Sequence, residues 1–334
     1  MARCATYWAL ALALASEGGS VGEFSQNLVS VIVPVYNGEK TMRRAIDSVL
    51  RQEGTSYEVI VVNDGSTDST AFILAGYGDA IRVIHQRNDG LPGARNRGIV
   101  ESRGEFLAFL DADDEWLPGK LRHQLEVFAA NPDVALVSTG SKWLDEDGRF
   151  ERFVRWELRG DVFRRLLYIN PINASSVMLR RSCLLACGLS FNTNLKRMDD
   201  WELWIRLSAR YPLVVSPEVL VYHYSTAEGE TRKDPPRLLG LYREVYPVLF
   251  NGLLQDAACA ATVKQEWNKI QGSIAFHLAV QQYGMDPRLG RRQIRHLTVT
   301  SPGSVRWRTA LTILLLPPSV RNWARSFISR FVWR

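Results

Sequence analysis

Residues 106–114 have the sequence Phe-Leu-Ala-Phe-Leu-Asp-Ala-Asp-Asp, an apolar run that passes directly into carboxylates. A short, continuous apolar run is typical of a strand that is buried on both faces of a parallel sheet. Similar runs lie at 28–35, 58–62, 81–84 and 134–138. Segments with helical periodicity separate them at 42–50, 93–100 and 117–130. The alternation predicts an α/β fold over 28–139, with a mostly parallel sheet flanked by helices.

The pattern becomes less regular after residue 140. We expect a hairpin over 142–155, a strand over 175–179, a short helix over 182–186 ended by Gly188, an amphipathic helix over 199–211, and an extended segment over 214–224 broken by Pro217. From Pro236 onward only helical patterns remain. The sequence therefore predicts a helical C-terminal extension on the α/β domain.

The charge of the chain is unevenly distributed. Hydrophobic residues make up 46% and charged residues 23%, which is ordinary for a folded protein. The net charge is +6, yet residues 287–334 hold ten Arg and no Lys, Asp or Glu. Apolar residues recur at helical spacing from Val320 to Phe331, which predicts a basic amphipathic helix suited to an anionic membrane surface. Packing of this stripe on protein is the alternative. We expect no nucleic-acid partner, because the body is acidic and no known module is visible.

The N-terminal segment resembles a signal peptide only in part. An apolar run over 4–15 has the length of a signal-peptide core, but a single Arg precedes it. We expect residues 1–27 to be a poorly ordered extension. No apolar segment reaches the ~20 residues that span a bilayer. The four cysteines lack zinc-site spacing, which favours small buried side chains in a reducing compartment and a cytoplasmic location.

Asp111 and Asp113 lie one residue apart, just after a predicted buried strand. If the strand geometry continues, both side chains point to the same side. Two crowded carboxylates repel each other unless a cation lies between them. Oxygen ligands suit Mg²⁺ or Mn²⁺, which commonly complete their shells with phosphate oxygens and water. A solvated acidic turn is the alternative, but the apolar run before the pair favours a metal site.

Three further polar clusters stand at the ends of predicted elements. Asp64 ends an earlier strand, where it could accept a hydrogen bond from a base or simply form a turn. The 88–98 segment has glycines that permit close approach and arginines that could contact phosphate. Asp199 and Asp200 begin a helix, where they could cap it or supply a general base. The residues alone leave both of these roles open.

Five ordered blocks resemble the family 2 glycosyltransferases of GT-A fold, over about residues 28–225. They are Val31-Ile-Val-Pro-Val-Tyr-Asn37, Val61-Val-Asn-Asp-Gly-Ser-Thr-Asp68, Gly93-Ala-Arg-Asn-Arg-Gly98, Phe109-Leu-Asp-Ala-Asp-Asp114 and Asp199-Asp-Trp-Glu-Leu-Trp-Ile-Arg206. The resemblance implies a GT-A domain over 28–225, with a nucleotide-binding half (28–139) and an acceptor half (140–225). Residues 226–334 then form the helical C-terminal region that ends in the basic amphipathic helix.

The resemblance also implies an inverting transfer of a sugar from a nucleotide-diphosphate donor, with a role for each site residue. Asp200 is the expected catalytic base. Asp113 and Asp111 are the expected ligands of Mn²⁺ or Mg²⁺. The expected donor-binding residues are Pro34, Tyr36, Asn37, Asp64, Arg95 and Asp111. Of these, Pro34, Tyr36 and Asp64 are expected to border a uracil or thymine base.

Two residues depart from the family pattern. Asn63 stands where the family usually has Asp, which leaves the base contact to Asp64, and Asp199 stands where Glu is more usual. We expect the acceptor to be a lipid-linked saccharide or an envelope polysaccharide, met by a protein that is peripheral at the inner face of the cytoplasmic membrane. The alternatives are a nucleotidyltransferase that acts on sugar phosphates and a catalytically silent membrane-surface scaffold.

Overall fold

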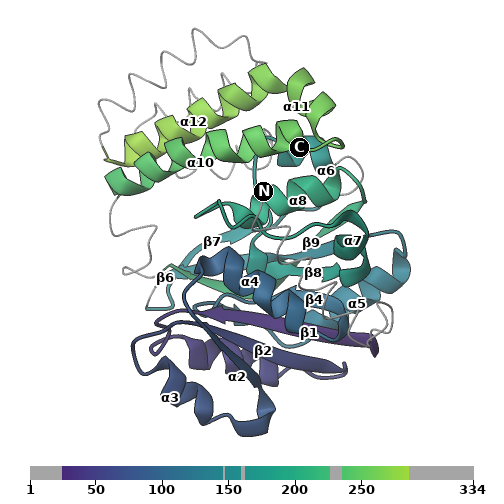
Figure 1. Ribbon diagram of the computed structural model, residues 1–334, viewed down its shortest axis with the longest axis vertical. Helices are drawn as coiled ribbons and strands as arrows, with labels where there is room; N and C mark the ends of the chain where they lie inside the picture. Colours follow the sequence, from purple (N-terminus) through teal and green to yellow (C-terminus); the bar gives the residue numbers. More distant parts are fainter. Residues whose placement is uncertain (1–24, 146, 159–161, 226–234, 286–334) are drawn as a thin grey trace.

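The computed structural model describes residues 25–145, 147–158, 162–225 and 235–285. The expectations for the first 24 residues and for the basic amphipathic helix lie outside these ranges. Figure 1 shows a central sheet with α2 and α3 at one end and the α10–α12 helices at the other. The helices are α2 Met42–Leu50, α3 Thr70–Ala75, α4 Gly90–Glu101, α5 Lys120–Ala130, α6 Val162–Leu166, α7 Arg181–Cys187, α8 Asp199–Ser208, α10 Pro235–Gln255, α11 Ala260–Gln265 and α12 Trp267–Met285, with 3₁₀ turns η1 Gly78–Ala80 and η2 Ala174–Ser176.

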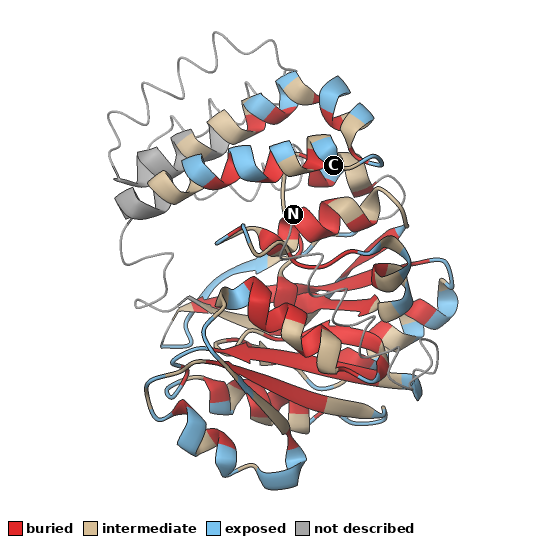
Figure 2. Cartoon of the chain, in the orientation of Figure 1, coloured by how far each residue is buried: buried red, intermediate tan, exposed pale blue. Residues whose placement is uncertain are grey.

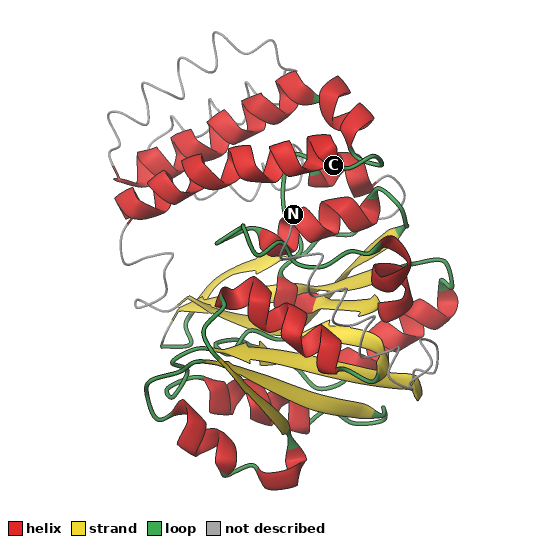
Figure 3. Ribbon diagram, in the orientation of Figure 1, coloured by secondary structure: helices red, strands yellow, loops and turns green. Residues whose placement is uncertain are grey.

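One nine-stranded sheet runs through the described residues, in the order β3-β2-β1-β4-β8-β6-β9-β5, and β7 pairs with β6 (Figure 3). The strands are β1 Ser25–Val35, β2 Tyr57–Asp64, β3 Arg82–Gln86, β4 Gly104–Phe109, β5 Glu115–Trp116, β6 Leu136–Asp145, β7 Phe150–Val154, β8 Val177–Arg180 and β9 Leu213–Ser225. The first four strands in this order are parallel. The predicted α/β fold with a mostly parallel, helix-flanked sheet is confirmed.

Strand β1 explains why the apolar runs are continuous. Val31 and Val33 pack into a cluster with Met42 and Ile46 of α2 on one face of the sheet. Ile32 faces the opposite way, into the cluster that contains α8. Both faces are therefore covered, which removes the polar alternation of a half-exposed strand (Figure 2).

Helix α4 lies unusually close to this strand. A side chain at Gly98 would collide with Ile32 of β1, so only glycine lets the helix approach this far. The close approach brings Arg95, one turn earlier on α4, beside the end of β4.

The second half of the sheet differs from a purely parallel arrangement. β8 runs antiparallel to both of its neighbours, β4 and β6. The predicted hairpin is confirmed as β6 and β7. Pro217 does not break the extended segment: β9 is continuous, and its pairing with β6 shifts register around Gly140. Such an irregularity tolerates the missing N–H of proline.

The C-terminal helices pack over α8 rather than over the sheet itself (Figure 1). α10 buries a stripe of apolar residues, Val245, Tyr246, Leu249, Phe250 and Leu253, in the same cluster as Trp201 and Trp204 of α8. The predicted helical extension is confirmed as far as Met285. In the part of the chain that is described, no helix combines the length and apolarity needed to cross a bilayer.

Candidate active site

The polar segments that follow β1, β2 and β4 meet at one edge of the sheet, because these strands are parallel neighbours. After β4 the chain turns, and the Asp114 N–H donates to the Asp111 carbonyl oxygen at 3.0 Å. Strand geometry therefore does not continue through Asp113, and alternation does not set the directions of the two side chains. A turn places them instead.

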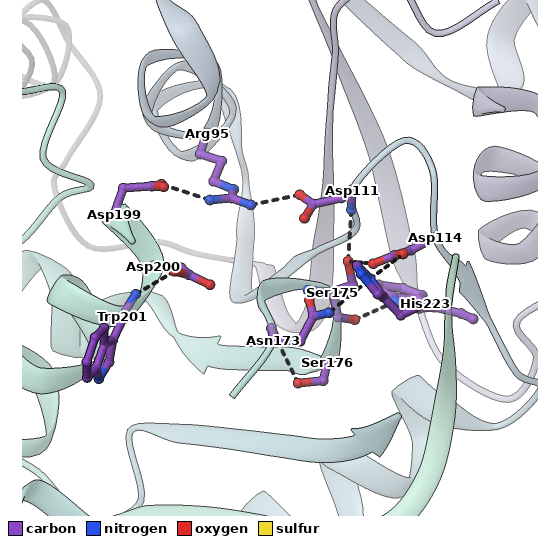
Figure 4. A network of polar contacts seen from close by, with 11 residues as sticks. Arg95, Asp111, Asp114, Asn173, Ser175, Ser176, Asp199, Asp200, Trp201 and His223 are labelled. Atoms are coloured by element: carbon purple, nitrogen blue, oxygen red, sulfur yellow. Dashed lines mark hydrogen bonds and ion pairs between the residues drawn. The ribbon is translucent and has the colours of Figure 1, made fainter. Parts of the chain in front are cut away.

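Arg95 links two groups of carboxylates that are distant in sequence. Its guanidinium lies 2.7 Å from Asp111 Oδ1 and 2.8 Å from Asp199 Oδ2 (Figure 4). The Arg95 side chain is only 3% exposed. Burial opposes its charge, but Asp111, Asp199 and Asp200 outweigh this and raise the pKa of Arg95. Each terminal nitrogen of Arg95 donates to one carboxylate and carries a second N–H, so a contact with the donor phosphates stays a prediction.

Asp114 is the centre of a second network on the other side of Asp111 (Figure 4). The Asp114 side chain is fully buried and lies 2.8 Å from His223 Nδ1. The Ser175 hydroxyl donates to Asp114 and accepts the Asp111 N–H at 3.1 Å. Burial disfavours a charged imidazole, but Asp114, Asp113 and Asp111 raise the pKa of His223 to about 9. An imidazolium at this position partly offsets the negative charge of the turn.

The turn is crowded with negative charge even so. Burial and the neighbouring carboxylates of Asp114 and Asp111 raise the pKa of Asp113 to about 7. Within the described ranges, no three His, Cys, Asp or Glu side chains are grouped so that they could hold a metal ion alone. Asp113 and Asp111 fit Mn²⁺ or Mg²⁺ as a pair of oxygen ligands, because such ions commonly take their other ligands from phosphate and water.

Asp200 stands in the first turn of α8, beside the Arg95 network. Met198 is the N-cap residue of this helix, and its side chain makes no cap hydrogen bond. The Trp201 N–H donates to Asp200 Oδ1 at 2.6 Å. Burial and the adjacent Asp199 carboxylate raise the pKa of Asp200 to about 7, against the opposing effect of Arg95. A carboxyl group with a pKa near neutrality is suited to general-base catalysis. In Figure 4 its carboxylate points toward the side of the site where Asp111 lies.

Asp64 lies at the end of β2 with one carboxylate oxygen already bound. Its Oδ1 accepts the Gln86 amide at 2.7 Å and the Asp89 N–H at 2.9 Å. Asn63, the residue that departs from the family pattern, accepts the Ser66 N–H within its own turn. Pro34 is buried at the end of β1, whereas Tyr36 is 54% exposed beyond it. An exposed ring and a partly bound carboxylate can border a planar base.

Asn37 joins the loops that follow β1 and β2. Its Oδ1 accepts the Thr67 N–H at 2.8 Å, and its N–H donates to Ser66 Oγ at 3.0 Å. The loop after β2 also lies close to the loop after β3. A side chain at Gly65, where φ is +75°, would lie 2.8 Å from the backbone nitrogen of Asn88. The structure thus gives the Asn37 side chain a bracing role between the loops.

Three residues of the site are not predicted from the sequence: Asp114, Ser175 and His223. Asp114 directly follows the Asp-Ala-Asp pair, so its position was a usable signal. Ser175 was placed in a predicted strand but lies in η2, whose N-cap Asn173 accepts the Ser175 N–H. His223 lies near the end of β9. A lone His in an extended segment gives no local indication of a distant carboxylate partner.

Removing the Arg95 charge tests the bridge between the two carboxylate groups. An Arg95→Leu variant is expected to lower the free energy of unfolding by about 3 kcal/mol, because it leaves buried carboxylates unpaired. The matched control is Arg97→Leu on the same helix, whose side chain is 40% exposed and pairs with Glu101. That change should cost less than about 1 kcal/mol. Urea denaturation measures both, and equal losses would contradict the bridge.

Sequence comparison identifies relatives of this chain. The family described as Glycosyl transferase family 2 matches residues 30–183. A Rickettsia typhi protein described as an uncharacterized glycosyltransferase is 32% identical over 253 residues, which cover 74% of this chain and 76% of the relative. A Rickettsia felis protein described in the same way is 31% identical, over 72% of this chain and 40% of the relative. The chain spans half or less of the length of the relatives from R. felis, R. conorii and R. bellii.

Solved structures share the fold at lower identity. S. aureus TarS in complex with UDP-GlcNAc has a TM-score of 0.60 and 19% identity, and the match covers 88% of each chain. The mannosyltransferase PcManGT from Pyrobaculum calidifontis, in complex with GDP-Man and Mn²⁺, has a TM-score of 0.58 and 17% identity, over 98% of this chain and 94% of that one. The GT-A architecture that the resemblance implied is confirmed.

Proposed function

The chain belongs to glycosyl transferase family 2, and on this basis we propose that it is an inverting enzyme that transfers a sugar from a nucleotide-diphosphate donor to a hydroxyl acceptor. One observation carries the proposal: Arg95 binds both Asp111, a candidate metal ligand, and Asp199, beside the candidate base. The groups that would hold the donor and activate the acceptor therefore belong to one connected constellation.

Each residue has a distinct task in this mechanism. Asp200 accepts the proton of the acceptor hydroxyl. As the proton leaves, the hydroxyl oxygen attacks the anomeric carbon of the donor sugar, from the face opposite the departing diphosphate. Asp113 and Asp111 would hold Mn²⁺ or Mg²⁺, which commonly takes further ligands from phosphate oxygens. The metal, when bound, stabilises the negative charge that develops on the diphosphate. Arg95 keeps Asp111 and Asp199 at fixed positions. The ion pair between Asp114 and His223 stabilises the turn that runs from Asp111 to Asp114.

The proposed donor is a UDP- or dTDP-sugar. Asp64 Oδ1 is already bound by Gln86 and the Asp89 N–H, so the second oxygen can accept the imide N–H of uracil or thymine. Tyr36 and Pro34 would border the ring. Fold neighbours hold UDP-GlcNAc in one case and GDP-Man with Mn²⁺ in another, so this architecture accommodates the donor class.

We propose that the acceptor is a lipid-linked saccharide or an envelope polysaccharide. The support is the Arg-rich composition of residues 287–334 together with the helical spacing of apolar residues from Val320 to Phe331, which suits an anionic membrane surface. The proposed location is the inner face of the cytoplasmic membrane, where such an acceptor and a nucleotide-sugar donor would meet.

A thermal-shift screen tests the donor assignment. UDP or dTDP with Mn²⁺ or Mg²⁺, at about 100 times Kd, is expected to stabilise the chain by about 2.7 kcal/mol, a rise in Tm of several degrees. EDTA should remove most of the shift, and ADP should give less. The Asp64→Asn variant keeps an oxygen for Gln86 but presents an amide N–H₂ to the base, so it should lose the preference for UDP. The absence of any metal-dependent nucleotide shift would reject the proposal.

The two alternatives predict different outcomes. A nucleotidyltransferase is expected to carry a Gly-rich, Lys- or Arg-bearing loop after the first strand, but Tyr36-Asn37-Gly38-Glu39 stands there. A silent scaffold would not release nucleoside diphosphate from a nucleotide sugar. Metal-dependent release that is lost in Asp113→Ala rejects the scaffold.

A further inference from the structure

We infer that helix α10 positions the catalytic base: Phe250 and Tyr246, on its buried face, hold Asp200 in place through the indole ring of Trp201. The inference rests on the proposed function, because it takes Asp200 to be the base. It assigns the C-terminal helical region a role in catalysis, although that region lies beyond residues 30–183 that match the family.

Trp201 makes one hydrogen bond through its backbone and another through its indole ring. Its N–H donates to Asp200 Oδ1 at 2.6 Å, so the Trp201 backbone directly holds the carboxylate. Its indole Nε1 donates to the Leu166 carbonyl oxygen of α6 at 2.7 Å. The side chain is 5% exposed. The orientation of this one residue therefore fixes both the hydrogen bond to Asp200 and the contact with α6.

Helix α10 supplies two aromatic contacts to the Trp201 ring. The edge-to-face partners are Tyr246, with ring centroids 6.3 Å apart at 83°, and Phe250, at 6.4 Å and 86°. Tyr246 and Phe250 stack on each other, and Phe250 also packs against Trp267 of α12. Because aromatic side chains have few rotamers and a defined contact geometry, this arrangement restrains the indole plane.

A polar contact fixes the other end of the two helices. Arg210, just after α8, donates to both carboxylate oxygens of Asp256, just after α10, at 2.9 Å each. Both bonds come from the single nitrogen Nη2, so this charge-assisted contact ties the ends of the two helices together. Held by Arg210 at its end and by Trp201 at its start, α8 cannot rotate without breaking contacts to α10. The base at the start of α8 thus depends on a helix that does not line the site.

The test replaces Phe250 and follows the catalytic rate separately from donor binding. Phe250→Ala is expected to lower kcat for release of nucleoside diphosphate by roughly tenfold to 100-fold, because small misplacements of a reacting group can cost that much. The Kd for UDP with Mn²⁺, measured by calorimetry, should stay within about twofold. Phe250→Leu, which refills most of the volume, should recover part of kcat. Assays are run well below the Tm of each variant.

The matched control is Val248→Ala on the outer side of α10, where the side chain is 43% exposed. It should leave kcat, Kd and the pH profile unchanged. The kcat–pH profile of Phe250→Leu, which keeps the core filled, should show a displaced acidic limb, because the surroundings of Asp200 change. A drop in kcat matched by an equal loss of UDP affinity would overturn the inference, since it would indicate general loosening of the fold. Unchanged kcat in both Phe250 variants would also overturn it.

A further variant separates this inference from the proposed function. If Asp200→Asn keeps the parent kcat, the assignment of the base fails, whatever the Phe250 variants do. If Asp200→Asn loses activity and the Phe250 variants do not, only the role of α10 fails.

Discussion

An Asp200→Asn variant is expected to lose about 10²–10⁴ in kcat, the usual contribution of a positioned general base. Asn is nearly isosteric and its Oδ1 can still accept the Trp201 N–H, so the change removes the proton acceptor and little else. The rate of nucleoside diphosphate release at saturating donor and metal measures the loss. The Kd for UDP with Mn²⁺ should not change, because Asp200 lies outside the proposed donor contacts.

The parent chain and the Asp200→Asn variant should also differ in how kcat depends on pH. Burial and Asp199 raise the pKa of Asp200 to about 7, so below that pH the carboxyl group holds its proton and cannot accept another. The parent kcat should therefore fall as pH drops through about 7, and it should level off above. The charges of Arg95 and Asp111 also shift the pKa of Asp200, so the pKa read from the kcat–pH profile includes their effects. Asp200→Asn should abolish this limb, whereas Asp133→Asn, an exposed carboxylate, should leave it intact. A flat profile in the parent chain would contradict the assignment.

An Asp113→Ala variant is expected to lose metal-dependent activity by roughly 10³-fold, which corresponds to about 4 kcal/mol of transition-state stabilisation. The loss differs in kind from that of Asp200→Asn. Donor affinity should fall together with kcat, and added Mn²⁺ should no longer stabilise the UDP complex. Calorimetry with UDP, with and without Mn²⁺, separates the two effects.

Asp113→Ala should also raise the stability of the chain without metal. It removes a carboxyl group whose pKa is raised to about 7, first by burial and then by the neighbouring carboxylates of Asp114 and Asp111. The control is Asp79→Asn in η1, an exposed carboxylate remote from the turn. An Asp113→Ala chain that still binds UDP in a Mn²⁺-dependent way would contradict the proposed metal role.

The parallel half of the fold could be predicted because burial on both faces leaves a direct signature in the sequence. Strands β1, β2 and β4 are continuous apolar runs for that reason. Helix α3 was missed because it is six residues long and buries only Thr70 and Leu74. β5 has two residues and no periodicity to detect. The antiparallel insertion of β8 depends on long-range pairing, which no local pattern encodes.

The roles of the site residues stay predictions, but part of their placement could be predicted from the sequence. Asp64, Asp111 and Asp113 follow the ends of the parallel strands β2 and β4, as expected, and Asp200 lies in the first turn of α8. Donor binding by Arg95 stays a prediction, and its pairs with partners 16 and 104 residues away could not be predicted from the sequence. Two roles were left open for the acidic pair at α8, and the structure separates its members. Asp199 pairs with Arg95 and Asp200 accepts the Trp201 N–H, while burial raises the pKa of both carboxyl groups.

The position of β8 has a consequence for how the chain can be synthesised and divided. β4 has β1 on one side, and its other side stays unpaired until residues 177–180 have been made. A nascent chain that ends before this point presents a bare strand edge and an uncovered apolar surface, the features that promote association between unfinished chains. We therefore expect that residues 28–139 do not fold as a separate unit. The family match closes at residue 183, three residues after β8 completes the edge.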